Sequence, residues 1–358
     1  MTAIFGNNLK ITIFGSSHSE FIGVVADGFE VGEKIDLEKI KKFLDRRKPG
    51  KNKYTSQRKE SDDVKFICGI ENNKIISNTI CAIIKNSDVK SNDYKNFSDI
   101  PRPSQIDFTA LKKYSSELDL RGSGFFSGRM TAPICVAGAI AIQILEKKGI
   151  KVLSHIKSVY NIKDEEIDYV SPDVKKLENC MKKEISVISK SSEEKIKELI
   201  NNIKEEGDSF GGVVECFIIS PPIGLGEPIF NSFESQLSHG IFSIPGVRYI
   251  SFGKGVDAPF MKGSNHNDEF EISDNKIVTK TNNSGGVVGG ITNGMPIVFS
   301  VAFKPTASIS KEQNSVSISK MQKEKLVIHG RHDPCFALRT PPVVEAIASL
   351  VLLDFMKG

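Results

Sequence analysis

The sequence predicts an α+β protein, and three observations point to this class. Helix and strand patterns alternate irregularly along the 358 residues, without the steady strand–helix rhythm of a parallel sheet. The segment 129–148 is apolar on almost all sides, which predicts a helix in the protein interior. The composition, 39% hydrophobic and 26% charged, is typical of a protein with a substantial core. Since no low-complexity linker divides the chain, we expect a single domain spanning 1–358.

The remaining elements follow from local patterns along the chain. The run "LKITIF" (9–14) alternates apolar and polar residues and predicts a strand. Asp36 can cap a helix that ends at "RRKPG", and its apolar residues have helical spacing: Leu37, Ile40, Phe43 and Leu44. The segment 191–207 has a cap, charge pairs four residues apart and a final Gly, so it predicts a solvated amphipathic helix. Thr340 and Pro341 open the last helix, with apolar residues at Val344, Ile347, Val351 and Phe355.

Charge and cysteine content narrow the possible functions. The formal net charge is only +4, so any anion-binding role must come from local clustering. The six cysteines form no CxxC pair and no metal-ligand spacing, which predicts reduced thiols and no metal site. The N-terminus lacks a signal pattern, and no apolar run approaches the roughly 20 residues of a membrane span. We therefore expect a cytoplasmic protein without membrane association.

Two polar segments near the N-terminus are candidates for chemistry. The stretch "FGSSHSE" (14–20) follows the first strand; it is either ordinary turn chemistry with a solvated histidine, or hydroxyls and a histidine facing a ligand. The segment "RRKPGKNKYTSQRK" (46–59) carries seven basic residues and no acidic one, and its Pro-Gly break predicts a loop. Arg and Lys on a loop suit phosphate or carboxylate groups. Nucleic acid is a weaker alternative because Tyr54 is the only aromatic residue, and a plain surface loop is another.

Three further segments are less specific taken alone. In "DLRGSGFFSGRMTAP" (119–133), glycines precede the buried helix, so backbone amides could approach an anion, but the pattern matches no nucleotide-binding fingerprint. In "NNSGGVVGGITNG" (282–294), the glycines could simply permit tight packing. In "HGRHDPC" (329–335), Arg331 beside Asp333 suggests a carboxylate held ionised near a charged ligand, with a self-satisfied surface ion pair as the alternative.

Together these segments resemble one family, chorismate synthase, nearly from end to end. The resemblance is carried by the ordered motifs "GSSHSEFIGVVADG", "RRKPGKNKYTSQRKESD", "RPSQIDFTALKKY", "RGSGFFSGRMTAP", "GDSFGGVVE", "PIGLGEP", "SIPGVRYISFGKG", "GSNHND", "NNSGGVVGGITNGMPIVFSVAFKPTASI" and "GRHDPC". It implies a β-α-β sandwich, with helices layered between antiparallel sheets, assembled as a homotetramer. It also implies a carbon–oxygen lyase of the shikimate pathway of aromatic amino acid biosynthesis. Such an enzyme converts 5-enolpyruvylshikimate 3-phosphate to chorismate by anti-1,4-elimination of phosphate.

The resemblance further implies a cofactor and roles for individual residues. Reduced FMN is required although the reaction has no net redox change. Because the chain has no nicotinamide fingerprint, we expect an external, NADPH-linked reductant. His18 matches the histidine near the departing phosphate, and Asp333 the acidic residue that tunes the flavin's proton acceptor. The basic residues expected to bind the substrate are Arg46, Arg47, Lys53, Arg58 and Arg129. The positions matching flavin contacts are Ser17, Ser127, Gly128, Arg129, Asn283, Lys304, Thr306 and Arg331.

One position departs from the family pattern in a way that affects the chemistry. In "RPSQID" (102–107), Gln105 stands where the family usually has a catalytic histidine that is thought to protonate reduced flavin. Glutamine can donate a hydrogen bond, but it cannot exchange a proton near neutral pH. A flavin- or anion-binding paralogue with impaired catalysis is therefore the alternative to a working lyase. A nucleic-acid-binding module that uses the basic segment is the third hypothesis.

Overall fold

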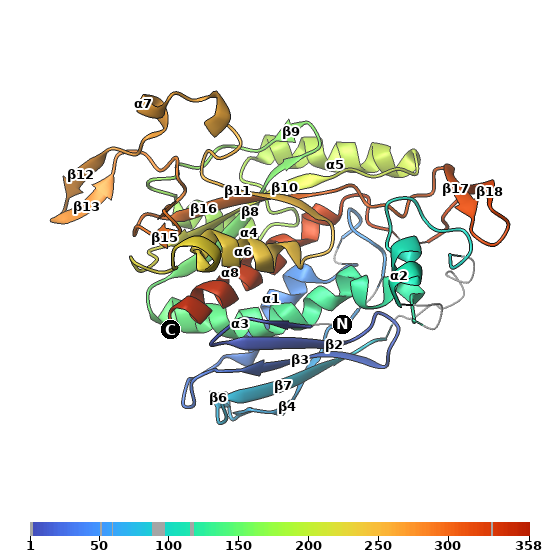
Figure 1. Ribbon diagram of the computed structural model, residues 1–358, viewed down its shortest axis with the longest axis horizontal. Coiled ribbons are helices and arrows are strands. Elements are labelled where there is room, and N and C mark those ends of the chain that lie inside the picture. The colour runs from blue at the N-terminus through green and yellow to red at the C-terminus, as the bar shows by residue number, and fades with distance from the viewer. Residues whose placement is uncertain (1–2, 51, 59, 88–96, 115–117, 331) are drawn as a thin grey trace.

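Two five-stranded antiparallel sheets enclose a layer of helices in the computed structural model, which describes residues 3–50, 52–58, 60–87, 97–114, 118–330 and 332–358 (Figure 1). The first sheet has the order β1-β2-β3-β7-β4, and every neighbouring pair is antiparallel. Its strands are β1 (Ile4–Phe5), β2 (Lys10–Gly15), β3 (Phe21–Asp27), β7 (Thr79–Lys85) and β4 (Val64–Cys68). The run predicted as the first strand forms β2.

The second sheet has the order β11-β16-β10-β8-β9 and is also antiparallel throughout. Its strands are β11 (Val247–Phe252), β16 (Ile297–Phe303), β10 (Gly212–Ile219), β8 (Lys151–Val159) and β9 (Ile162–Lys163). Short hairpins lie outside both sheets: β5 (Ile70–Glu71) with β6 (Lys74–Ile75), β12 (Phe270–Ser273) with β13 (Lys276–Thr279), β14 (Val287–Val288) with β15 (Ile291–Thr292), and β17 (Gln313–Ser317) with β18 (Gln322–Leu326).

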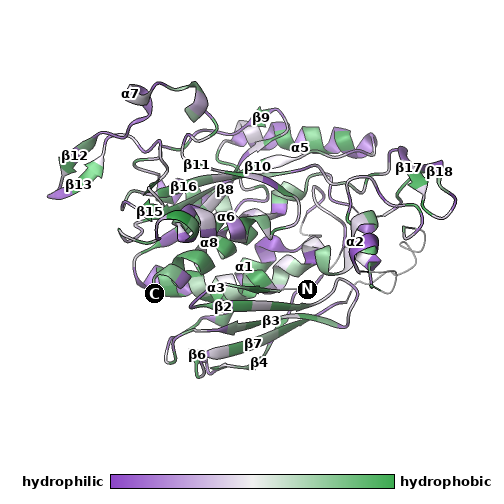
Figure 2. Ribbon diagram, viewed as in Figure 1, coloured by the Kyte–Doolittle hydropathy of each residue, from purple (hydrophilic) through white to green (hydrophobic). Residues whose placement is uncertain are grey.

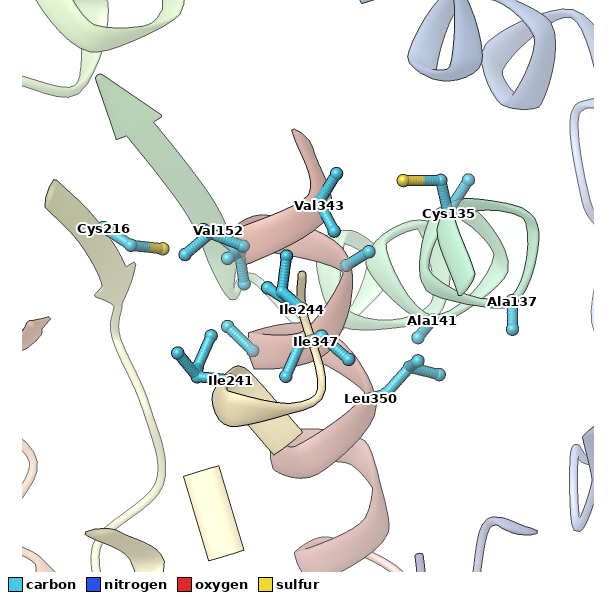
Figure 3. Close-up of a cluster of buried hydrophobic side chains, with 14 of the residues drawn as sticks. Cys135, Ala137, Ala141, Val152, Cys216, Ile241, Ile244, Val343, Ile347 and Leu350 are labelled. Atoms are coloured by element: carbon cyan, nitrogen blue, oxygen red, sulfur yellow. The ribbon is translucent and has the colours of Figure 1, made fainter. Parts of the chain in front are cut away.

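The helices between the sheets are α1 (Leu37–Arg47), α3 (Thr131–Lys147), α6 (Phe233–Phe242) and α8 (Pro341–Phe355). Helices α3 and α8 are apolar along most of their length, as Figure 2 shows by colour, whereas α1 is amphipathic and buries Ile40 and Leu44 on one face. Helices α3 and α8 approach closely because Gly138 has no side chain: a Cβ there would be 2.3 Å from the Cβ of Ala346. Helix α6 packs against α8 through Gly240 and Ile347, in the region that Figure 3 shows. This layering of helices between antiparallel sheets confirms the predicted α+β sandwich.

Local sequence signals account for the helix ends. The Asp36 side chain accepts hydrogen bonds from the Glu38 and Lys39 amides at the start of α1, as its capping position predicts. Pro341 is the first residue of α8. The solvated helix predicted for 191–207 is α5 (Lys190–Glu205), which buries Ile196, Ile200 and Ile203 on one face. The other helices are α2 (Asp107–Tyr114), α4 (Val174–Met181) and the short α7 (Gly263–His266).

The core helix α3 corrects one expectation about membranes. With the preceding short helix η3 (Gly128–Met130), it forms a helical segment, Gly128–Lys147, of 20 residues with a mean hydropathy of 1.5. By length and composition this segment could cross a membrane, although no apolar run of that length was expected. In the folded protein, 83% of the most apolar 18-residue stretch of this segment is buried, because α3 lies between the two sheets. This burial is typical of a core helix.

Candidate active site

A cavity of about 180 Å³ lies where six distant segments of the chain meet, one of them the turn at Pro245 and Gly246 before β11. The basic segment and the residues after it contribute Ser56, Arg58 and Glu60, and the short helices η2 (Arg121–Phe126) and η3 contribute Gly122, Ser123, Phe126, Gly128 and Arg129. Arg102 and Gln105 come from the loop before α2, Lys304 to Ser308 follow β16, and His332, Asp333 and Arg339 precede α8. Four of the motifs that the sequence singled out therefore converge on one cavity.

A second, more apolar cavity of about 670 Å³ adjoins the first. Its lining includes Ile13, Tyr114, Phe125, Ile134 and Phe242. Five residues line both cavities and so form the wall between them: Gln105, Phe126, Pro245, Gly246 and Lys304. The first cavity is lined by several basic residues and is called the charged cavity below, and the second is called the apolar cavity. Ligand pockets typically combine apolar walls with a few polar groups, so the two adjoining cavities together could hold a ligand with both kinds of group.

Asp333 ties two walls of the charged cavity together. One carboxylate oxygen accepts the Ser56 backbone amide at 2.8 Å, and the other accepts Arg339 Nε at 3.1 Å and a terminal nitrogen of Arg339 at 2.8 Å. Asp333 is 8% exposed. The sequence suggested Arg331 as its neighbour, but Arg331 lies outside the described residues. Sequence reasoning missed Arg339, because a partner six residues away has no local pattern.

Two arginines and two carboxylates form a buried cluster behind the cavity. Arg129 donates one terminal nitrogen to both Glu60 (2.8 Å) and Asp62, and Arg47 donates to Glu60 at 3.1 Å and to Asp62 at 2.7 Å. Burial would raise the pKa of Asp62, but the nearby Arg47 and Arg129 outweigh it and lower that pKa to about 2. Glu60 and Asp62 come directly after the segment 46–59. The negative charges that pair with Arg47 therefore lie outside the segment, and this is why the segment by itself contains no acidic residue.

The structure places Arg46, Arg47 and Lys53 away from the charged cavity. Arg46 and Arg47 are the last residues of α1 rather than part of the predicted loop. Both terminal nitrogens of Arg46 pair with the Glu345 carboxylate, at 2.6 and 2.7 Å, and the Arg47 side chain is fully buried. The Lys53 ammonium lies over the Tyr54 ring, 5.3 Å from its centroid. Of the basic residues expected to bind substrate, Arg58 and Arg129 line the cavity.

Arg102 is a second wall arginine that sequence reasoning did not single out. It pairs with both oxygens of Asp107, at 2.8 and 2.6 Å, and donates to the hydroxyls of Ser123 and Ser308, each at 3.2 Å. These bonds join three segments of the cavity wall and hold the loop that carries Gln105. The arginine stands in the quoted motif "RPSQID", but its partners could not be read from the motif alone.

His18 lies against the glycine-rich wall and does not itself line the cavity. A Cβ on Gly122 would be 2.5 Å from His18 Cε1 and 2.6 Å from Ser17 Oγ, and Gly122 has a φ of +58°. The Ser17 amide also donates to the Gly124 carbonyl at 3.1 Å. The first motif and the glycine-rich segment are therefore in direct contact, and the lack of a side chain at position 122 permits this.

The remaining expected flavin contacts divide into two groups. Ser127, Gly128, Lys304 and Thr306 line the charged cavity. Burial, and secondarily Arg248, lowers the pKa of Lys304 from its ordinary value. Asn283 lies instead in a separate cavity of about 640 Å³ and donates to the His266 carbonyl at 3.1 Å. Within the described part of the chain, no group of three His, Cys, Asp or Glu residues could hold a metal ion.

Comparisons with known proteins all match nearly the whole chain to one family. The family model described as "Chorismate synthase" matches residues 9–356. A relative named "Chorismate synthase" from Methanobrevibacter smithii is 40% identical over 356 residues, which is 99% of this chain and 96% of the relative. One from Korarchaeum cryptofilum is 38% identical, with 98% and 96% covered. A solved structure, "Crystal Structure of Chorismate Synthase", is similar with a TM-score of 0.78 and 25% identity, and covers 98% of this chain and 92% of that one.

Proposed function

Because the chain belongs to the chorismate synthase family and is therefore a lyase, we propose that it converts 5-enolpyruvylshikimate 3-phosphate to chorismate and phosphate by anti-1,4-elimination. The observation that carries the proposal is the convergence of basic and hydroxyl side chains on the charged cavity. Arginine and lysine there suit a substrate with one phosphate and two carboxylates. Those that line it are Arg58, Arg102, Arg129, Lys304 and Arg339.

Reduced FMN is proposed as the cofactor, and the residues present fit a flavin nucleotide. Its planar ring needs an apolar compartment beside the substrate, and the second cavity shares Phe126 and Gln105 with the charged one. Ser127, Gly128, Lys304 and Thr306 would hold its polar groups, and Lys304 donates to the Ser104 carbonyl rather than to a carboxylate. When bound, reduced FMN would supply an electron that weakens the allylic C–O bond and take it back as the C–H bond breaks.

The chain's own residues would bind, orient and transfer protons. His18, in contact with Gly122, is proposed to protonate the departing phosphate. Gln105, in the wall between the cavities, would orient the flavin by a hydrogen bond. Asp333, which accepts a hydrogen bond from Arg339, would lie beside the proton-accepting group. Arg331, outside the described residues, and Asn283, in the separate cavity of about 640 Å³, stay proposed flavin contacts.

Phosphate release tests this function. The protein is mixed with 5-enolpyruvylshikimate 3-phosphate and reduced FMN without oxygen, and phosphate and chorismate are both measured. Equal amounts of both products support the proposal. Flavin binding without either product would favour the second candidate, a catalytically impaired paralogue. The observation behind this candidate is Gln105, which stands where the family usually has a histidine.

We also propose a homotetramer in the cytoplasm that receives its reduced flavin from an external reductant. The hairpin β12–β13 projects from the body of the molecule (Figure 1) and exposes apolar side chains: Phe270 is 76% exposed, Ile272 81% and Ile277 71%. Large exposed apolar patches often mark interfaces between proteins. Light scattering after size-exclusion chromatography would give the mass; a monomer at micromolar concentration would contradict the assembly.

A further inference from the structure

Glu60 and Asp62 share the same two arginines but differ in their surroundings. Both lie in the cluster with Arg47 and Arg129. The Asp62 side chain is 1% exposed and does not line the cavity, whereas Glu60 is 11% exposed and lines it beside Arg129. One carboxylate therefore belongs to the interior and the other to the wall of the substrate cavity.

The hydrogen-bond geometry follows the same division. Asp62 uses one oxygen for each arginine: Oδ2 accepts from Arg47 at 2.7 Å and Oδ1 from Arg129. A single Glu60 oxygen, Oε2, accepts from both arginines, at 3.1 and 2.8 Å. Asp62 also has a φ of +52°, a backbone conformation that non-glycine residues rarely adopt unless their surroundings impose it. Asp62 is the more firmly held of the two.

The charges of the cluster balance, and this matters for substrate binding. Two arginines face two carboxylates, so Arg129 presents little net positive potential to the cavity while both pairs are intact. An anionic group of the substrate that approaches Arg129 must compete with the carboxylate of Glu60, which lines the same cavity. It does not meet Asp62, which is buried behind Arg129.

We propose that Glu60 is a displaceable counter-ion of Arg129. It holds the guanidinium in place before the substrate binds and yields it to a phosphate or carboxylate of the substrate, while Asp62 and Arg47 remain as the permanent anchor. Glu60 is thus a positioning residue that sets the affinity for anions. This inference rests on the proposed function for the identity of the substrate. The competition between Glu60 and a bound anion applies to any anion at Arg129.

The proposal predicts opposite effects for two similar substitutions. Glu60→Gln removes the competing charge and keeps a hydrogen-bond acceptor, so the substrate should bind about fivefold more tightly. Asp62→Asn loosens Arg129 and should weaken binding by about fivefold or more. Titration calorimetry without reduced flavin measures both values in the absence of turnover. Glu146→Gln is the matched control, because it removes the same charge from an exposed pair with Lys39 and should leave affinity unchanged.

The inference is decided by whether Glu60→Gln lowers or raises the dissociation constant of the substrate. Weaker or unchanged binding in this variant, with thermal unfolding like that of the wild type, would overturn it, whether or not Asp62→Asn folds. In steady-state assays the substitution should lower KM with a smaller change in kcat, which loss of a purely structural bond would not do. A wild-type protein that releases no phosphate would contradict the proposed function rather than this inference. In that case, titration with inorganic phosphate would still show whether Glu60→Gln tightens or weakens the binding of an anion.

Discussion

The carboxylate of Asp333 accepts the backbone amide of Ser56 at 2.8 Å, across 277 residues of sequence. This bond fastens the end of the basic segment to the segment before α8, and both line the charged cavity. The same carboxylate pairs with Arg339. Asp333 therefore has a structural role, in addition to the catalytic role proposed for it above.

Asp333→Asn should separate these two roles. The amide oxygen can still accept the Ser56 bond, so the variant should fold, while turnover should fall at least about tenfold, or about 1.4 kcal/mol in barrier. Steady-state rates and thermal unfolding measure both effects. The comparison variant is Arg339→Gln, which breaks the ion pair but keeps the Asp333 charge. An equal loss of turnover in the two variants would mean that Asp333 acts by positioning Arg339.

Gln105→His tests whether this position must carry a proton. General acid catalysis is worth about 10²–10⁴ in rate, so a required proton donor predicts a clear gain in kcat. If a hydrogen bond to the flavin suffices, the rate should change little. We expect a modest gain, and we expect His18→Ala to abolish most turnover. Should both substitutions leave kcat unaltered, the impaired-paralogue hypothesis becomes the better one.

Gly122→Ala should disturb the site through His18. The new Cβ would lie 2.5 Å from the His18 ring, in a backbone conformation with φ +58°. Gly289→Ala is a matched control because φ is +64° there and nothing lies within 4 Å of the added Cβ. Both variants bear the backbone strain, so Gly122→Ala should lose an additional about 1–3 kcal/mol of unfolding free energy. Similar urea midpoints for the two variants would contradict the contact.

Asp62 predicts a specific dependence of stability on pH. Its pKa is lowered from 3.8 to about 2 in the folded state, so its contribution is present above pH 4 and is lost as the pH falls toward 2. The shift corresponds to about 2 kcal/mol. Urea unfolding of the wild type and of Asp62→Asn should therefore differ at pH 7 and converge toward pH 2. A difference that does not depend on pH would show that the charge is not the cause.

Arg47→Ala should act mainly on stability. The arginine is fully buried and compensates Glu60 and Asp62, so its removal leaves buried carboxylate charge and should cost about 3–5 kcal/mol of unfolding free energy. Lys53→Ala, in the same basic segment but exposed, should stay within about 0.5 kcal/mol. Chemical denaturation compares them. Equal stability of the two variants, with substrate binding lost in Arg47→Ala alone, would return Arg47 to the role of a direct substrate ligand.

The sequence by itself determined the elements whose causes are local. The cap at Asp36, the Pro341 start of α8, the strand at 9–14 and the apolar helix 129–148 each depend on residues within a turn or two, and the structure has all of them. The motifs that line the cavity were also visible, because their residue types are unusual together. Their resemblance to one family identified the sandwich before any packing was known.

Only the tertiary structure decided which charges are available to a ligand. Arg46 and Arg47 looked like a substrate clamp, but Arg46 pairs with Glu345, 299 residues away, and Arg47 with Asp62. Arg102 and Arg339 line the cavity, held by Asp107 and Asp333. An ion pair depends on distance in space and on burial, and neither follows from spacing along the chain. The types of the charged residues are therefore readable in the sequence, whereas their partners are set by how the two sheets and the helices between them pack.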